Sequence, residues 1–135
     1  MKKLIALILL LPALLFAEVK NLNISSFEKL KQNGIPVIDI RTPQEWKETG
    51  IIDKSHTVMF FRPNGSYDVK DFLNRLHALG IDKEKPFILV CRSASRTRMV
   101  GNFLSEKLGY RNVYHLSGGI LNWKRHGKPL KPYLQ

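Results

Sequence analysis

Cysteine is almost absent from this chain, which has one, Cys91, among 135 residues. A single thiol excludes an internal disulfide and argues against a dithiol redox centre, because both need a second cysteine in the same chain. Any sulfur exchange at Cys91 therefore depends on an outside molecule. The thiol is either a buried structural residue or a nucleophile, and composition alone leaves both open.

Acidic residues and metal-binding patterns are also sparse. The chain has 22 basic and 11 acidic side chains, a net charge of +11. Such a chain attracts anions, but we find no groove-reading helix and no aromatic stacking motif, so we expect small anionic substrates or anionic lipid headgroups rather than nucleic acid. We expect no metal or other cofactor, because no histidine shows metal-ligand spacing. Surface or half-buried positions are expected for His56, His77, His115 and His126.

Long apolar runs are lacking except at the start of the chain. Lys2 and Lys3 precede fourteen uncharged residues, 4–17, which is short of the roughly 20 that a bilayer-spanning helix needs. The pattern predicts a signal peptide over 1–17 that is cleaved after the small Ala17, and hence a periplasmic protein with no stable membrane span. An uncleaved membrane anchor is the alternative.

The remaining 118 residues, 18–135, suffice for one domain with a hydrophobic core. Without Lys2 and Lys3 the net charge falls to +9. Short apolar runs alternate with helical patterns, which is typical of a parallel sheet with crossover helices. We expect strands near 18–24, 36–40, 56–60, 86–91 and 112–116. Helices are expected over 25–34, 42–50, 68–80, the segment between Cys91 and Gly109, and 117–127.

Several helix boundaries carry local signals. Ser25 or Ser26 is expected to cap the first helix and Gly34 to end it, and Thr42 to cap the second with Pro43 in the first position. Apolar residues at helical spacing predict one buried face on each longer helix. The faces comprise Val69, Phe72, Leu73, Leu76 and Leu79 on one helix, and Met99, Val100, Phe103, Leu104 and Leu108 on the other. Packing positions are expected for Tyr110, Tyr114 and Tyr133.

Cys91 ends the most apolar segment of the mature chain, "PFILVC" (86–91), and "RSASRTR" follows it. The segment is expected to be the central strand, and ligands bind at the carboxyl edge of such sheets. Small and flexible residues over 92–96 let the loop curl with its amides toward the sulfur. These amides, the next helix's N-terminus and the arginines favour the thiolate, which is the nucleophilic form. This setting favours a nucleophile over a structural thiol.

Three segments together carry a family resemblance. They are "DIRTPQEW" from Asp39, "CRSASRT" from Cys91 and "LSGGILNW" from Leu116. In order and separation they resemble the rhodanese-like sulfurtransferase domain, over a core of about 24–127 within 18–135. The resemblance implies a three-layer α/β/α sandwich with a five-stranded parallel sheet. It also implies a rhodanese-type thiosulfate sulfurtransferase, which takes sulfane sulfur from a donor such as thiosulfate, forms a cysteine persulfide and passes the sulfur to a thiol or cyanide.

The resemblance also assigns roles to individual residues. Cys91 would be the catalytic persulfide carrier, and Arg92 and Arg96 would bind the donor's sulfonate oxygens. The backbone amides of Arg92, Ser93, Ala94, Ser95 and Arg96 would bind the terminal sulfur. Asp39 and Arg41 match an Asp-x-Arg pair that would support this loop, with a simple capping turn as the alternative.

Other positions match or depart from the family pattern. Glu45, Trp46 and Trp123 are expected to pack, the last behind the loop, and Gly118 and Gly119 to allow a tight turn beside it. Where the family often has Gly-His-Ile, this chain has "GII" over 50–52. Ala94 stands where glycine is common, which constrains the loop if that position needs a positive φ.

Two other function classes stay open. One is a persulfide carrier or partner-docking module that holds sulfur for a protein acceptor without rapid turnover. The other is a cysteine-dependent phosphatase or arsenate reductase, whose loop places five residues between cysteine and arginine. Here four residues separate Cys91 from Arg96, and the smaller loop fits a sulfur atom better than a phosphoryl group. We expect a monomer acting on small molecules.

Overall fold

A five-stranded parallel sheet forms the middle of the molecule. The computed structural model describes residues 18–134, so the expected signal peptide over 1–17 lies outside the described residues. The strands are β1 (Lys20–Leu22), β2 (Val37–Asp39), β3 (His56–Thr57), β4 (Phe87–Val90) and β5 (Val113–Leu116), in the order β1-β5-β4-β2-β3. Every pairing between them is parallel. β4 occupies the centre, as predicted from its apolar sequence.

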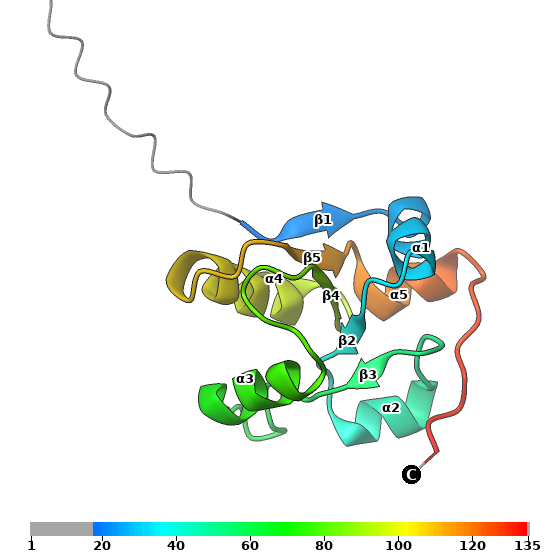
Figure 1. Ribbon diagram of the computed structural model, residues 1–135. Coiled ribbons are helices and arrows are strands. Elements are labelled where there is room, and N and C mark those ends of the chain that lie inside the picture. The colour runs from blue at the N-terminus through cyan, green and yellow to red at the C-terminus, as the bar shows by residue number, and fades with distance from the viewer. Residues whose placement is uncertain (1–17, 135) are drawn as a thin grey trace, which may run out of the picture.

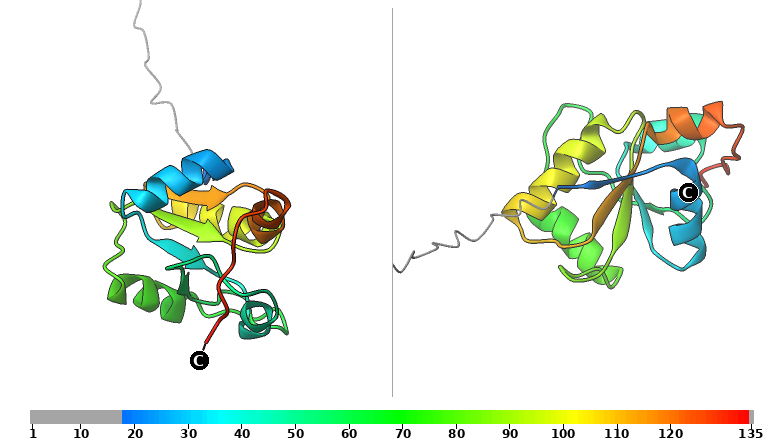
Figure 2. Two further views of the ribbon diagram at one scale, coloured as in Figure 1. Left: turned by 90° about the vertical axis from the view of Figure 1, so that its right-hand side faces the viewer. Right: turned by 90° about the horizontal axis from the view of Figure 1, so that it is seen from above.

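Helices cover both faces of the sheet (Figure 1). They are α1 (Ile24–Gln32), α2 (Pro43–Thr49), α3 (Val69–Ala78), α4 (Ser95–Asn102), the π-helical turn η1 (Phe103–Lys107) and α5 (Gly119–Arg125). α3 and α4 lie on one side, and α1, α2 and α5 lie on the other (Figure 2). The predicted three-layer α/β/α sandwich is confirmed.

The central strand β4 is buried on both faces, which explains its continuous apolar run. Phe87 and Leu89 belong to the core cluster on the side of α3 and α4, and Ile88 and Val90 to the cluster on the side of α1 and α5. Alternation along the strand places the next residue, Cys91, in the first of these clusters. The thiol therefore lies on the α4 side of the sheet.

The helix caps agree with the sequence at α2 and differ at α1. Thr42 caps α2, with Pro43 first and a capping box completed by Glu45. At α1 the cap is Asn23, whose side chain accepts from the amide of Ser26. The predicted serine cap is wrong because the cap lies two residues before Ser25, so both serines fall in the first turn of the helix.

The buried face of α4 is as predicted at Val100, and at Leu104 in η1, but not at Met99. Thr97, Val100 and Gly101 are its buried residues, while Met99 is 62% exposed. Gly101 fixes this rotation, because a Cβ there would lie 2.5 Å from Cγ2 of Val19, so only glycine permits this contact. Across residues 18–134, none of the helices is both long and apolar enough to cross a membrane.

Candidate functional site

Cys91 lies directly after β4 and has no exposed surface. Residues 92–94 form a short loop, and α4 begins at Ser95. The thiol is therefore placed between the carboxyl end of the central strand and the N-terminus of a helix, as the sequence predicted. Within the loop Arg92 and Ser93 are exposed and Ala94 is buried.

The start of α5 holds the Cys91 loop in place. The amide of Ile120 donates to the Cys91 carbonyl at 2.9 Å, and that of Leu121 to the Arg92 carbonyl at 3.1 Å. In a trans peptide the C=O and N–H groups point in opposite directions. The amides of Arg92 and Ser93 therefore point away from α5, and within residues 18–134 no acceptor bonds to them. Two backbone donors without an acceptor among residues 18–134 suit the binding of an anion at this loop.

Glycines make this close approach possible. Gly118 and Gly119 have φ values of +71° and +60°. A Cβ on Gly119 would lie 2.4 Å from the carbonyl oxygen of Cys91. The tight turn expected beside the loop is thus present, and its second glycine contacts the loop backbone directly. Trp123, on the buried side of α5, packs edge-on against Phe27.

Ala94 adopts a left-handed backbone conformation. A positive φ is therefore required at this position, where the family commonly has glycine, and the alanine does constrain the loop. Its φ is +77° and its ψ is 0°, at the N-cap of α4. Alanine pays a steric penalty there that glycine avoids. The carbonyl of Ala94 then accepts from the amide of Arg98 at 3.0 Å and from Oγ1 of Thr97 at 3.2 Å.

Arg96 forms a two-pronged ion pair with Glu45. Its Nη1 and Nη2 donate to the two carboxylate oxygens at 2.7 and 2.8 Å. Partial burial acts to raise the pKa of Glu45, but the Arg96 hydrogen bonds and charge outweigh it, so the pKa is lowered. The Glu45 hydrogen bond raises the pKa of Arg96, and the charges of Glu45 and the Cys91 thiolate add to the rise. Glu45, assigned to packing from the sequence, instead positions Arg96 in the first turn of α4.

Asp39 and Arg41 form a buried ion pair, each 1% exposed. Arg41 donates to Asp39 through Nε and Nη2 and to the carbonyl of Gly50 at 2.9 Å. Trp46 donates to Asp39 at 3.0 Å. Within residues 18–134 neither charged side chain bonds to residues 91–97, so the pair fixes α2. Any support for the loop runs through Glu45 on that helix.

A series of hydrogen bonds between polar side chains connects the sulfur of Cys91 to the edge strand β1. Cys91 Sγ lies 3.6 Å from Oγ1 of Thr97, which lies 2.7 Å from Nδ1 of His115. Nε2 of His115 bonds to Oδ1 of Asn21 on the edge strand β1. His115 has no exposed surface, so its predicted surface or half-buried position is wrong. The alternation of β5, with Val113 buried on the same face, was the signal that could have placed it inside.

The protonation state of His115 follows from its surroundings. Burial, with a smaller contribution from the charge of Arg98, lowers its pKa to about 4. The imidazole is therefore neutral at physiological pH. A neutral ring has one N–H donor and one acceptor nitrogen, which matches its two partners.

Comparison with known proteins identifies the family. The family model described as rhodanese-like domain matches residues 24–126. The chain belongs to the rhodanese-like family. A sulfurtransferase of Allochromatium vinosum is 31% identical over 94 residues, covering 70% of this chain and 76% of that protein. The thiosulfate sulfurtransferase GlpE of Coxiella burnetii is 26% identical, covering 77% of this chain and 85% of that one.

Solved structures share the fold of this rhodanese-like domain. The polysulfide-sulfur transferase homodimer of Wolinella succinogenes superimposes with a TM-score of 0.65 at 28% identity, covering 87% of this chain and 82% of that chain. Within residues 18–134 no three side chains of His, Cys, Asp or Glu gather in a way that could hold a metal ion.

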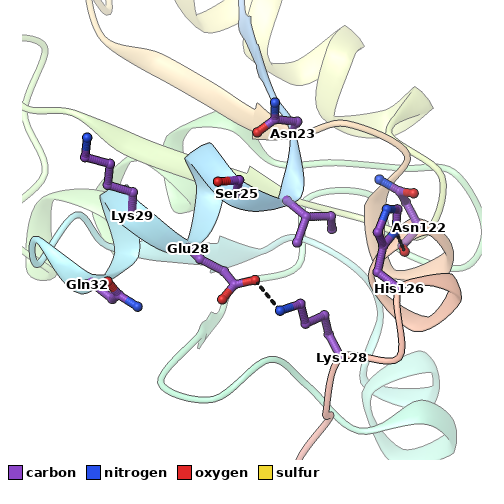
Figure 3. A pocket seen from close by; sticks show the side chains of 9 residues that line it. Asn23, Ser25, Glu28, Lys29, Gln32, Asn122, His126 and Lys128 are labelled. Atoms are coloured by element: carbon purple, nitrogen blue, oxygen red, sulfur yellow. Dashed lines mark hydrogen bonds and ion pairs between the residues drawn. The ribbon is translucent and has the colours of Figure 1, made fainter.

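Other hollows of the rhodanese-like domain lie away from the thiol. An open hollow between α1 and α5 includes Glu28, which pairs with Lys128 at 2.7 Å (Figure 3). None of residues 91–97 lines it, so this hollow is separate from the Cys91 loop. A smaller apolar hollow beside α4 is lined by Phe60, Phe61, Tyr67, Met99, Val100 and Phe103.

Proposed function

We propose that this protein is a sulfurtransferase that moves a sulfane sulfur from thiosulfate to a thiol or cyanide through a persulfide on Cys91. One observation carries the proposal: the thiol lies at the end of the central strand, and the next two amides, those of Arg92 and Ser93, have no acceptor among residues 18–134. These donors suit a singly charged sulfur atom. Relatives named sulfurtransferase and thiosulfate sulfurtransferase support the assignment.

The reaction has two steps. The Cys91 thiolate attacks the outer sulfur of thiosulfate, a new S–S bond forms, and the donor's S–S bond breaks with its electron pair leaving on sulfite. An acceptor thiolate or cyanide then attacks the outer sulfur of the persulfide and regenerates the Cys91 thiolate. Because the chain has no second cysteine, the acceptor is an outside molecule.

Arg92 and Arg96 bind the sulfonate end of the donor in this proposal. Arg92 is exposed in the loop itself. Arg96 uses two of its N–H groups on Glu45, and a guanidinium has five, so donors remain for sulfonate oxygens. The net charge of +9 that remains without residues 1–17 favours the approach of a dianion.

Intact-mass spectrometry tests the persulfide. After incubation with thiosulfate and removal of excess donor, the protein should gain the mass of one sulfur atom, and a reducing thiol should remove it. The matched control is Cys91→Ser, which should gain nothing. A wild-type protein that stays unmodified at saturating thiosulfate would contradict the mechanism.

Steady-state kinetics separates an enzyme from a persulfide carrier. The enzyme consumes many equivalents of thiosulfate with cyanide or a small thiol present. A carrier loads one sulfur and stalls until its protein acceptor is added. Arg96→Ala should raise the KM for thiosulfate by about tenfold, the loss of one charge-assisted hydrogen bond. The control Arg125→Ala removes an equal charge from the exposed end of α5 and should leave KM unchanged.

We also propose that residues 1–17 direct export to the periplasm and are then removed, and that the mature protein works as a monomer. The charge and apolar pattern of the leader supports the first part. N-terminal sequencing of the periplasmic fraction should give Glu18 as the first residue. Sedimentation equilibrium should give the molecular mass of one chain. The mass of a dimer would contradict this proposal and would match the homodimeric state of the Wolinella protein.

A further inference from the structure

The Cys91 thiol is linked to the edge of the sheet by three side chains on one face. His115 on β5 lies opposite Leu89 on one neighbouring strand and opposite Asn21 on the other. Thr97, in the first turn of α4, bridges from above the sheet. Thr97 and His115 are completely buried. The proposed chemistry gives neither of them a role.

The donors and acceptors of these side chains determine which group donates in each of the hydrogen bonds between them. Oδ1 of Asn21 only accepts, so Nε2 of His115 carries the proton. In a neutral ring Nδ1 is then an acceptor, and the hydroxyl proton of Thr97 has two acceptors, Nδ1 at 2.7 Å and the carbonyl of Ala94 at 3.2 Å, both away from the sulfur. The Thr97 oxygen thus presents a lone pair to the sulfur at 3.6 Å, where a thiol can donate to it but a thiolate cannot.

The groups around His115 keep its ring neutral above about pH 5, so the direction of these hydrogen bonds does not change there. On α4 the nearest charge is Arg98, which disfavours a second proton on the ring. On β4 the residue opposite is the apolar Leu89, Cys91 after that strand reaches the ring through Thr97, and on β1 the partner is the uncharged Asn21. The cation of Lys20, also on β1, lies over the ring of Tyr114 on the opposite face of the sheet.

We propose that His115 is a positioning residue that holds the Thr97 hydroxyl turned away from the sulfur and thereby raises the pH at which Cys91 ionises. The inference rests on Cys91 acting as the nucleophile of the proposed function. The loop amides favour the thiolate, while the Thr97 oxygen favours the thiol. His115 sets the balance between them, and with it the pH profile of sulfur loading.

An ultraviolet pH titration tests this directly. The thiolate absorbs where the thiol does not, and subtracting the Cys91→Ser titration isolates the single cysteine. In His115→Leu the Thr97 hydroxyl loses its nearer acceptor, and only the neutral carbonyl of Ala94 at 3.2 Å then competes with the charged thiolate, which is the stronger acceptor. The titration midpoint should fall by roughly one pH unit, about tenfold in the ionisation constant, as expected for one hydrogen bond to a charged group.

A double-mutant cycle shows whether the effect passes through Thr97. In a Thr97→Val background, which keeps the shape and removes the hydroxyl, His115→Leu should shift the midpoint by less than a third as much. Thr97→Ser should retain the wild-type response to His115→Leu. The packing control Val113→Ala, on the same face of β5, should lower stability and leave the midpoint unchanged. Equal shifts in both backgrounds, or a shift in Val113→Ala, would overturn the proposal.

A surface variant keeps the test open if His115→Leu does not fold. Asn21 is exposed, and Asn21→Ala removes the group that fixes the proton on Nε2. The midpoint should then fall in the same direction by a smaller amount, and an unchanged midpoint would count against the inference. The titration needs no sulfur donor, so a failed persulfide assay and a failed titration are distinguishable results.

Discussion

His115 carries a neutral imidazole in the protein interior, and this has a consequence for stability. Its pKa in the folded protein is lowered to about 4 by burial and by Arg98, against about 6.5 in an unfolded chain. Between these values the unfolded chain binds more protons than the folded one. The contribution to stability is therefore complete above about pH 6.5 and is lost as the pH falls toward 4.

Urea denaturation at pH 7 and pH 5 measures this loss. The wild-type protein should lose about 1–2 kcal/mol of unfolding free energy between these conditions. Both pH values lie above the ordinary pKa of carboxyl groups, about 4. In His115→Leu most of the difference should vanish, whereas the exposed His126→Leu should behave like wild type. A pH dependence that survives in His115→Leu would assign the loss to another group.

Glu45 and Arg96 act as one unit from two elements. Because the pKa of Glu45 is lowered, the pair is fully charged near neutral pH. Glu45→Gln leaves the guanidinium without its ionic partner and less firmly oriented beside the loop. The KM for thiosulfate should rise by about three- to fivefold, less than in Arg96→Ala, with kcat changed little. A fall in KM would mean that Glu45 competes with the donor for Arg96.

At the scale of the loop, backbone strain is concentrated at Ala94. Its φ of +77° suits glycine, so Ala94→Gly should raise the unfolding free energy by about 0.5–1 kcal/mol. The control is Lys54→Gly, at the other non-glycine residue of positive φ within residues 18–134. It should give a similar gain and no change in activity. Destabilisation by Ala94→Gly would show that packing of the buried methyl group outweighs the relief of strain.

The contact between α5 and the loop tolerates no side chain at Gly119. A Cβ there would lie 2.4 Å from the Cys91 carbonyl oxygen and 2.5 Å from that of Arg92. Gly119→Ala should move the loop and lower kcat/KM by at least tenfold, the effect of a misplacement of about 1 Å. Gly127→Ala has a similar φ, +67°, with no atom within 4 Å of the new Cβ. It should cost about 1 kcal/mol of stability and leave kcat/KM unchanged.

The features that could be predicted from the sequence are those that depend on neighbouring residues, and contacts between residues far apart in the chain could not be predicted. The Thr42–Pro43 start of α2 and the central strand before Cys91 rest on neighbouring residues and on burial, and both were confirmed. The Glu45–Arg96 pair joins residues 51 positions apart. The bond from His115 to Asn21 depends on β1 pairing with β5, across 94 positions. No local pattern encodes such contacts, because they depend on the order of strands and the rotation of helices.

On the scale of the whole molecule, the C-terminal segment connects the two helices that hold the Cys91 loop. It leaves α5 and runs past α2 on the outside of the sandwich (Figure 1). Lys131 pairs with Ile51 through two backbone hydrogen bonds of 2.8 and 2.7 Å. Tyr133 packs on Trp46 with ring centroids 5.3 Å apart. The segment thus ties α2, which carries Glu45, to α5, which binds the loop carbonyls.

Deletion of residues 130–135 tests this connection. It removes both backbone hydrogen bonds and the aromatic contact, so the unfolding free energy should fall by about 2–3 kcal/mol. Because α2 also loses Tyr133 behind Trp46, Glu45 should hold Arg96 less firmly, and the KM for thiosulfate should rise as in Glu45→Gln. The control Leu134→Ala changes a side chain that is 86% exposed and should alter neither quantity. A deletion variant with reduced stability and an unchanged KM would show that the segment supports the fold but not the position of Arg96.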